Sequence, residues 1–274
     1  MNANGDSFLS GQLLEQGDSV AVECSICEMR SDFFEEAQIL RKYQVKFFRC
    51  KTCGFVQTEA PYWLDDAYST AISRLDTGIL YRNLQNLRVT SAVIDLLFPQ
   101  SKKSLDFGAG HGIFVRLMRD RGFNFFWYDL HASNDYARGF ESKMDATYDF
   151  LTSFEVLEHL ADPLKELSAM MERSPNILVS TELLPHPTPR ISEWWYYSPL
   201  GGQHVSFFTA EALAIVARRF KRHLLSHGPF HLFSIAPQSK FLFRLAASQR
   251  GSRVLNAIRR RPSLMSSDHE LMSK

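Results

Sequence analysis

The run Leu105-Asp106-Phe107-Gly108-Ala109-Gly110-His111-Gly112 constrains the fold of this chain more than any other segment. A short apolar stretch ends in glycines at alternate positions, and residues 113–121 continue with the apolar spacing of a helix. Alternating glycines let the backbone turn sharply and let a ligand approach where any side chain would collide. The segment therefore predicts a strand, a ligand-binding turn and a helix.

Strand and helix patterns alternate through the rest of this region. Further strands are expected at 125–128, 150–154 and 176–181, and helices at 78–98, 163–173 and 210–220, with a closing strand pair at 223–226 and 231–236. This order predicts an α/β fold, a doubly wound and mostly parallel Rossmann-like sheet with an antiparallel closing strand. Ligands of such sheets bind at the carboxyl ends of the strands.

The glycine turn does not fit a dinucleotide site. A GxGxxG pattern that starts at Gly108 would need a small residue at position 113, which is Ile113. The carboxylate of Asp106 would repel a pyrophosphate, whereas it suits an ammonium group. Asp129 ends the next strand, where an acid can accept hydrogen bonds from both hydroxyls of a ribose.

These features resemble the class I S-adenosylmethionine (SAM)-dependent methyltransferases, whose first motif is an acid followed by GxGxG. The run YDFLTSFEVLEHLADP at 148–163 looks like the fourth-strand motif of that family with its LEH..DP continuation, and QHVSFFT at 203–209 resembles the HxxFF segment of one broad subgroup. The match covers residues 78–236. The resemblance implies SAM as cofactor, held by Asp106, Gly108, Ala109, Gly110, Gly112, Asp129, Ser153 and Phe154; plain packing is an equal alternative for the last two.

A second constellation consists of Glu155, Glu158, His159 and His204. The pattern E-x-x-E-H with a later histidine is similar to that of methyltransferases that bind a divalent ion, such as Mg²⁺, near the acceptor hydroxyl. One interpretation is therefore a metal site. In a second, His204 acts as a general base, with His159 and Glu155 beside it. In a third, the acid and histidine side chains only stabilise a loop. The general base is favoured slightly over the metal site.

All four cysteines lie in two CxxC pairs, Cys24 with Cys27 and Cys50 with Cys53. Two such pairs can supply four thiolates to one tetrahedral Zn²⁺, so residues 20–60 are predicted to form a zinc ribbon with a closed structural site. Gly54 permits the tight turn after the second pair, whereas Glu28 occupies the equivalent position after the first. Clustered cysteines of this kind favour metal over disulfides in a reducing compartment, and a cytoplasmic location is expected.

The composition limits which partners the chain can bind and describes its terminal segments. The chain has 31 Lys and Arg against 30 Asp and Glu, so the whole molecule does not attract nucleic acid or anionic lipid by its net charge of +1. Residues 1–19 are polar and predict a flexible lead-in. Residues 61–236 form the expected methyltransferase domain, and residues 237–274 carry eight Lys or Arg and two acids, a basic C-terminal segment. No apolar run is long enough for a membrane span.

The sequence predicts an enzyme that methylates a hydroxyl or other nucleophile of a small, sugar-like or nucleotide-linked acceptor. One alternative is an RNA methyltransferase in which the ribbon and basic tail, including Arg259-Arg260-Arg261, grip the phosphate backbone. A further alternative is an interaction module that binds the cofactor without turnover. The aromatic run 194–197 could stack on either a sugar or a base, so it does not separate the two substrates.

Overall fold

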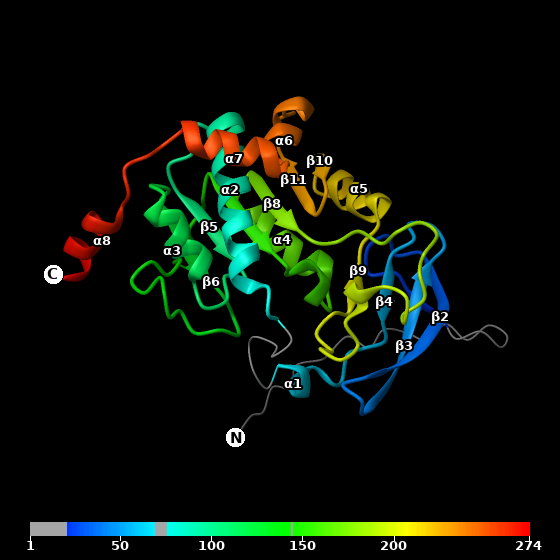
Figure 1. Cartoon of the computed structure of the whole chain (residues 1–274). Helices are drawn as coiled ribbons and strands as arrows, with labels where there is room; N and C mark the ends of the chain where they lie inside the picture. Colours follow the sequence, from blue (N-terminus) through cyan, green and yellow to red (C-terminus); the bar gives the residue numbers. More distant parts are fainter. Residues whose placement is uncertain (1–20, 69–75, 144) are drawn as a thin grey trace, which may run out of the picture.

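The chain forms two β-sheets, a larger one flanked by helices and a smaller one built mainly from the N-terminal region (Figure 1). This computed structural model describes residues 21–68, 76–143 and 145–274. The lead-in expected at 1–19 lies outside the described residues. Within the described part of the chain, no helix is long and apolar enough to cross a membrane.

The larger sheet confirms the predicted fold class. β11 runs antiparallel to both of its neighbours, β8 and β10, while β8, β7, β5 and β6 pair in parallel. The antiparallel strand is therefore inserted next to the sheet edge. Across the sheet the strands are β10 (His223–His227), β11 (Phe230–Ser234), β8 (Asn176–Ser180), β7 (Phe150–Phe154), β5 (Ser104–Phe107) and β6 (Phe125–Tyr128).

Helices cover both faces of this sheet because its central strands are apolar on both sides. In β8, Ile177 and Val179 join one buried cluster and Leu178 joins the other. The first cluster includes α4 and α5, and the second includes α2, α3 and α6. The helices are α1 (Leu64–Ala67), α2 (Ile79–Leu97), α3 (Ile113–Asp120), α4 (Pro163–Arg173), α5 (Ala210–Arg219), α6 (Lys240–Ala247), α7 (Gln249–Ile258) and α8 (Met265–Met272), with short 3₁₀ turns η1 (Leu157–His159) and η2 (Trp195–Tyr197).

The smaller sheet takes strands from two distant parts of the chain. Its strands are β1 (Ala21–Glu23), β2 (Arg30–Ile39), β3 (Tyr43–Cys50), β4 (Val56–Thr58) and β9 (Ser206–Phe207). β9 pairs with β4 through Val56 and Phe207. The first four strands fall within the region expected to be a ribbon, and the fifth belongs to the segment that follows His204. The two sheets are therefore joined next to the candidate site.

The basic C-terminal segment is helical and folds back onto the larger sheet. Arg261 forms an ion pair of 2.7 Å with Asp95 of α2, and Arg259 donates to the Asp95 carbonyl at 2.8 Å. In α8, buried Asp268 accepts from the buried guanidinium of Arg119 at 2.6 Å. Some of the basic side chains of the tail are thus engaged in contacts within the molecule and are less available to bind phosphate.

Candidate cofactor site and metal-binding clusters

The three glycines after β5 have different surroundings, although all have a positive φ. A Cβ on Gly108 would lie 2.5 Å from a methyl of Val156, and a Cβ on Gly112 would lie 2.7 Å from Oδ1 of Asn134. A Cβ on Gly110 would meet no atom of the described residues within 4 Å. Gly108 and Gly112 are therefore required for packing within the chain, while Gly110 borders open space that a ligand can occupy.

Asp129 connects this open space to the end of β6. Its Oδ2 accepts from the backbone N–H of Gly110 at 2.8 Å, and its Oδ1 accepts from the N–H groups of His131 and Ala132 at 2.7 and 2.8 Å. The indole of Trp127 donates to the Gly110 carbonyl at 2.7 Å. A carboxylate has about four acceptor positions, so Asp129 fixes the glycine turn and retains capacity for a further donor.

Asp106 is a buried acid on β5 beneath the same turn. Its carboxyl accepts from the Thr152 hydroxyl at 2.6 Å. Burial and, to a smaller extent, the charge of Asp129 together raise the pKa of Asp106 to about 8, against the lowering effect of that hydrogen bond. A carboxyl in this position is stabilised in its ionised form by a nearby cation. The predicted role of Asp106, facing an ammonium group, is compatible with this environment and stays a prediction.

The remaining expected cofactor residues lie close to the strand ends but differ in exposure. Ala109 is half-buried, and its N–H donates to the Tyr128 carbonyl at 3.1 Å. Ser153 is fully buried, and its hydroxyl has no partner among the described residues. The ring of Phe154 packs edge-on against Phe114 and Phe230. These contacts favour the packing alternative for Phe154.

Glu158, His159 and His204 come together beyond the end of β7. The η1 turn carries Glu158 and His159, and the Val205 N–H donates to the Glu158 carbonyl at 2.8 Å, which brings the preceding His204 alongside. The two imidazole rings are perpendicular with centroids 4.9 Å apart. One ligand atom from each of the three residues lies within 4.8 Å of the others.

Hydrogen bonds to backbone carbonyls orient both histidines. Nδ1 of His159 lies 3.1 Å from the Gln203 carbonyl, and Nδ1 of His204 lies 2.6 Å from the Tyr196 carbonyl. Because a carbonyl only accepts, Nδ1 of His204 carries the proton and its Nε2 keeps the lone pair. The same holds for His159 when the Tyr68 hydroxyl, 3.0 Å from its Nδ1, accepts there rather than donates. Metal-binding histidines are oriented by such a bond on the other ring nitrogen.

The Glu158 carboxylate is completely buried, and neither oxygen has a hydrogen-bond donor in good geometry among the described residues. Burial raises the pKa of Glu158 to about 7, and the Tyr196 hydroxyl opposes this rise. Leaving a buried carboxylate without a partner is costly. A cation between Glu158 and the two imidazoles would remove that cost.

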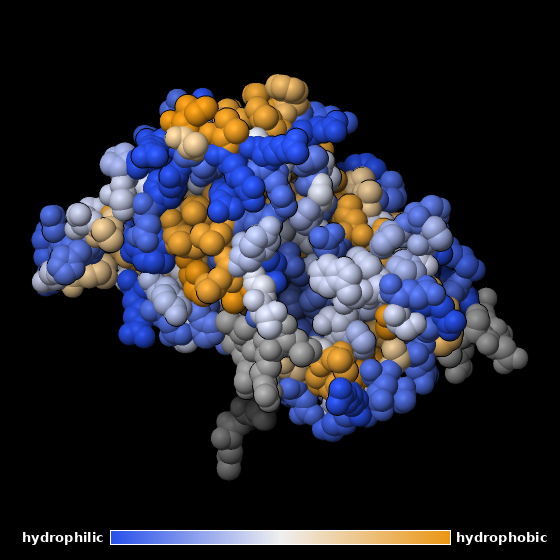
Figure 2. All heavy atoms as spheres, viewed as in Figure 1, coloured by the Kyte–Doolittle hydropathy of each residue, from blue (hydrophilic) through white to orange (hydrophobic). Residues whose placement is uncertain are grey.

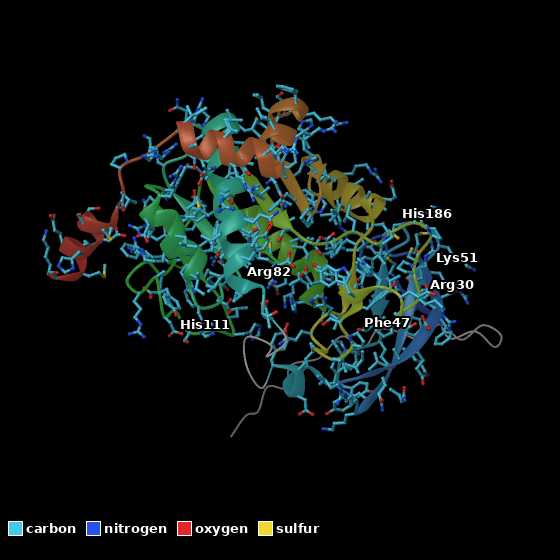
Figure 3. All side chains as sticks on the ribbon, in the orientation of Figure 1. Arg30, Phe47, Lys51, Arg82, His111 and His186 are labelled. Atoms are coloured by element: carbon cyan, nitrogen blue, oxygen red, sulfur yellow. The ribbon has the colours of Figure 1, made fainter. Side chains whose placement is uncertain are left out.

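Glu155 is the one member of the predicted constellation outside this group of three. Its carboxylate accepts from the Ser180 hydroxyl at 2.7 Å, and its backbone has a left-handed φ of 53°. Burial and the charge of Glu158 raise the pKa of Glu155 to about 7, while Arg82 on the first turn of α2 (Figure 3) lowers it. Glu155 therefore contributes charge to the cluster without joining the three close ligands.

Tyr68 is a candidate site residue that the sequence did not reveal. Its hydroxyl lies 3.0 Å from Nδ1 of His159, and its ring stacks on His131 at 5.8 Å. Tyr68 thus connects the segment after Asp129 to the histidine pair. Nothing in its neighbouring residues marks it, because both contacts are made with parts of the chain that are remote in sequence.

The four cysteines converge as the spacing predicted. Sγ of Cys24 lies 3.6 Å from that of Cys53, and Sγ of Cys27 lies 3.4 Å from that of Cys50. Four thiolates at about 2.3 Å from one Zn²⁺ would be about 3.8 Å apart, so a small adjustment accommodates the ion. No pair is joined by a disulfide. The residues present therefore fit a structural zinc ion.

The two cysteine turns are equivalent in backbone conformation. Gly54 donates to the Cys50 carbonyl with a φ of 72°, and Glu28 donates to the Cys24 carbonyl with a φ of 63°. The left-handed position expected of a glycine is thus present in both turns. Thr209 caps α5 and also donates to the Cys53 carbonyl at 2.5 Å, so the second turn is bound directly to the N-terminus of α5.

We predict that the purified protein contains about one Zn²⁺ per chain at the cysteines, because four thiolates complete one tetrahedral shell. Cys50→Ser should lose this zinc and expose the amides of β1 to β4 to hydrogen exchange, since zinc binding and folding are coupled in such modules. Elemental analysis and exchange measurements test this, with the distant Ser267→Ala as a matched control. A folded wild-type protein with four free thiols and no zinc would contradict it.

Residues 81–220, about half of the chain, match the family described as Methyltransferase domain. The chain belongs to this family. Together with the mostly parallel sheet and the glycine turn, this confirms the predicted class, the class I SAM-dependent methyltransferases. A comparison with curated proteins found no match.

Several solved methyltransferase structures are similar to part of this chain at low sequence identity. The structure "PigF with SAH" is 17% identical, with a TM-score of 0.46 over 62% of this chain and 61% of that one. An O-methyltransferase family protein from Burkholderia thailandensis is 15% identical, with a TM-score of 0.44 over 64% and 62%. The plantazolicin methyltransferase BpumL in complex with SAH is 11% identical, with a TM-score of 0.46 over 70% and 88%. The chain thus spans less than two thirds of the length of the first two proteins.

Proposed function

We propose that this protein transfers the methyl group of SAM to an oxygen nucleophile of a small-molecule acceptor that is held beside Glu158, His159 and His204. The observation that carries the proposal is the open space at Gly110, bordered by Asp129, which Tyr68 connects to the buried Glu158 carboxylate through its contacts with His131 and His159. Among the described residues that carboxylate has no donor in good geometry. Open space next to the glycine turn suits a cofactor, and the carboxylate with two imidazoles suits the acceptor end of the reaction.

In this proposal each residue of the cofactor site has one task. Asp129 accepts a ribose hydroxyl at its remaining acceptor position, Asp106 faces the ammonium end, and Gly110 allows the cofactor to lie against the backbone. Methyl transfer is a displacement at a carbon already activated by positive sulfur, so the protein mainly supplies alignment and excludes water. Tyr68 would close the site from the side of His131, because its ring already stacks there.

The Glu158–His159–His204 cluster would hold a divalent ion through one carboxylate and two Nε2 atoms. When bound there, such an ion lowers the pKa of an acceptor hydroxyl and orients it. The mixture of imidazole and carboxylate suits Mn²⁺ or Zn²⁺ better than Mg²⁺, which prefers oxygen ligands and bound water. This geometry favours His204 as a metal ligand over His204 as a general base.

Contacts of the basic segment and the burial of Glu158 bear on the alternatives for the acceptor and the function. A sugar-like acceptor and the LEH/HxxFF subgroup remain predictions from the sequence. The Arg259-Arg260-Arg261 run is less suited to grip an RNA backbone, because Arg261 pairs with Asp95 and Arg259 donates to the Asp95 carbonyl. A cofactor-binding module without turnover would not need the buried Glu158.

The division into a ribbon, a methyltransferase domain and a basic segment, and the cytoplasmic location, also remain predictions.

Asp129→Ala should weaken SAM binding by about 1.5–3 kcal/mol, the range of hydrogen bonds to a charged group. The loss combines missing ribose contacts with a looser Gly110 turn. Calorimetry measures the effect, and Glu270→Ala, which removes an exposed carboxylate of α8, should bind as the wild type does. Unchanged affinity in a folded Asp129→Ala variant would remove Asp129 from the cofactor site.

A further inference from the structure

The helices α6 and α7 form one outer face of the molecule that combines exposed apolar and basic side chains. In Figure 2 apolar residues gather over these two helices next to strongly hydrophilic ones. We define the α6–α7 face by its exposed apolar residues Phe241, Leu245, Val254 and Ile258 and its exposed cations Lys240, Arg244, Arg250 and Arg253.

The apolar residues of this face are not part of the core. Phe241 and Ile258 are 75% and 74% exposed, and Val254 is 57% exposed. Each helix buries a different side, with Phe243 and Ala246 of α6 packed in the cluster that contains α2. The pairs Phe241 with Leu245 and Val254 with Ile258 are four residues apart, so each pair shares one stripe of its helix. Large apolar side chains exposed in two neighbouring stripes favour a binding surface.

The cations of the face have no counter-ion in the part of the chain that the structure describes. Residues 236–267 contain seven Lys or Arg and no Asp or Glu. Of these, Arg259 and Arg261 are bonded to Asp95. The four cations of the face have no ion-pair partner among the described residues, unlike Arg116 and Arg218, which are paired elsewhere on the surface. Positive charge that is not neutralised within the molecule attracts an anionic partner.

From this combination we propose that the α6–α7 face docks on an anionic lipid surface. Helices that lie in a membrane interface insert apolar side chains below the headgroups while flanking Lys and Arg residues contact anionic lipids. Both contributions are present on this face. The proposal is independent of the methyl acceptor, because none of these residues belongs to the candidate site.

Two other occupants fit the face less well. A second copy of the chain would place the same unpaired cations against each other across a two-fold axis, which is unfavourable. A nucleic acid would bind the arginines but would give no comparable gain for Leu245, Val254 and Ile258, which cannot stack on bases as aromatic side chains do. An anionic membrane satisfies the charged and the apolar residues together.

Co-sedimentation of the full-length protein with lipid vesicles tests the proposal. The protein should bind vesicles of phosphatidylglycerol and phosphatidylcholine, bind pure phosphatidylcholine much more weakly, and dissociate at about 1 M salt, where screening is nearly complete. Arg250→Glu with Arg253→Glu should lower the partition coefficient by at least about 25-fold, since each cation contributes about fivefold. Phe241→Ser with Ile258→Ser should lower it to a similar extent.

Matched controls separate a specific face from general effects. Lys165→Glu and Leu271→Ser change an exposed cation and an exposed apolar residue on other helices and should leave vesicle binding unchanged. Circular dichroism checks that each variant is folded. The proposal is wrong if the wild type does not bind anionic vesicles, or if both double variants bind as the wild type does. It is also wrong if the face instead mediates dimerisation in light scattering, or binding to single-stranded RNA, without vesicle binding.

Discussion

Removing the ion from the Glu158–His159–His204 cluster should reduce methyl transfer by roughly 10³-fold or more while leaving SAM affinity unchanged, since an ion that activates a hydroxyl contributes several kcal/mol. A chelator too weak to extract the ribbon zinc serves for this experiment, and added Mn²⁺ should restore turnover. Glu158→Ala and His204→Ala should have the same effect without a chelator. The exposed His223→Ala on β10 provides a matched control for loss of an imidazole.

The count of bound ions separates a metal site from a general base. With Mn²⁺ supplied, the wild type should hold one ion more than Glu158→Ala, in addition to the ribbon zinc. If His204 is a general base, both proteins hold the same number of ions, a chelator has no effect, and only His204→Ala loses about 10²–10⁴-fold in rate. Near-wild-type turnover by a folded, chelated His204→Ala variant would contradict both roles.

Gly110→Val should abolish detectable binding of the cofactor while the chain still folds. Among the described residues an added Cβ meets no atom within 4 Å, so the main structural cost is the left-handed backbone, about 1–2 kcal/mol. The same side chain projects into the space that the cofactor needs beside Asp129. Calorimetry measures the binding and thermal unfolding measures the cost.

Gly108→Ala is the matched comparison for Gly110→Val. Its Cβ would approach Val156 to 2.5 Å, so this variant should lose stability through a collision inside the protein. Gly110→Val should therefore lose cofactor binding, whereas Gly108→Ala should lose folding stability. Wild-type affinity in Gly110→Val would contradict the assignment of the open space to the cofactor.

The central strands of the larger sheet and the helices around it could be predicted because local sequence patterns indicate them. The apolar runs at β6 and β7 and the cap residue Thr209 of α5 lie where the sequence indicated. Asp106, Gly110 and Asp129 could be singled out because they lie at or just after predicted strand ends. The spacing of the two CxxC pairs predicted that the four thiols come together. In each case the signal lies within a few residues of the feature that it predicts.

Other features depend on contacts between remote segments. β9 has two residues and exists because β4 offers an edge, so no periodicity could reveal it. The tail was predicted only as a basic segment, since its short helices are stabilised by packing on α2 and by pairs such as Arg119 with Asp268. The orientations of His159 and His204 depend on backbone carbonyls that a residue pattern does not show.

Calorimetric titration of the zinc-containing protein with S-adenosylhomocysteine tests the central claim, a cofactor site at the glycine turn, most directly. The account predicts saturable binding of about one molecule per chain, accompanied by a higher unfolding temperature, since a ligand that binds only the folded state stabilises it. A folded protein that gives no heat of binding and no thermal shift at saturating ligand would contradict it.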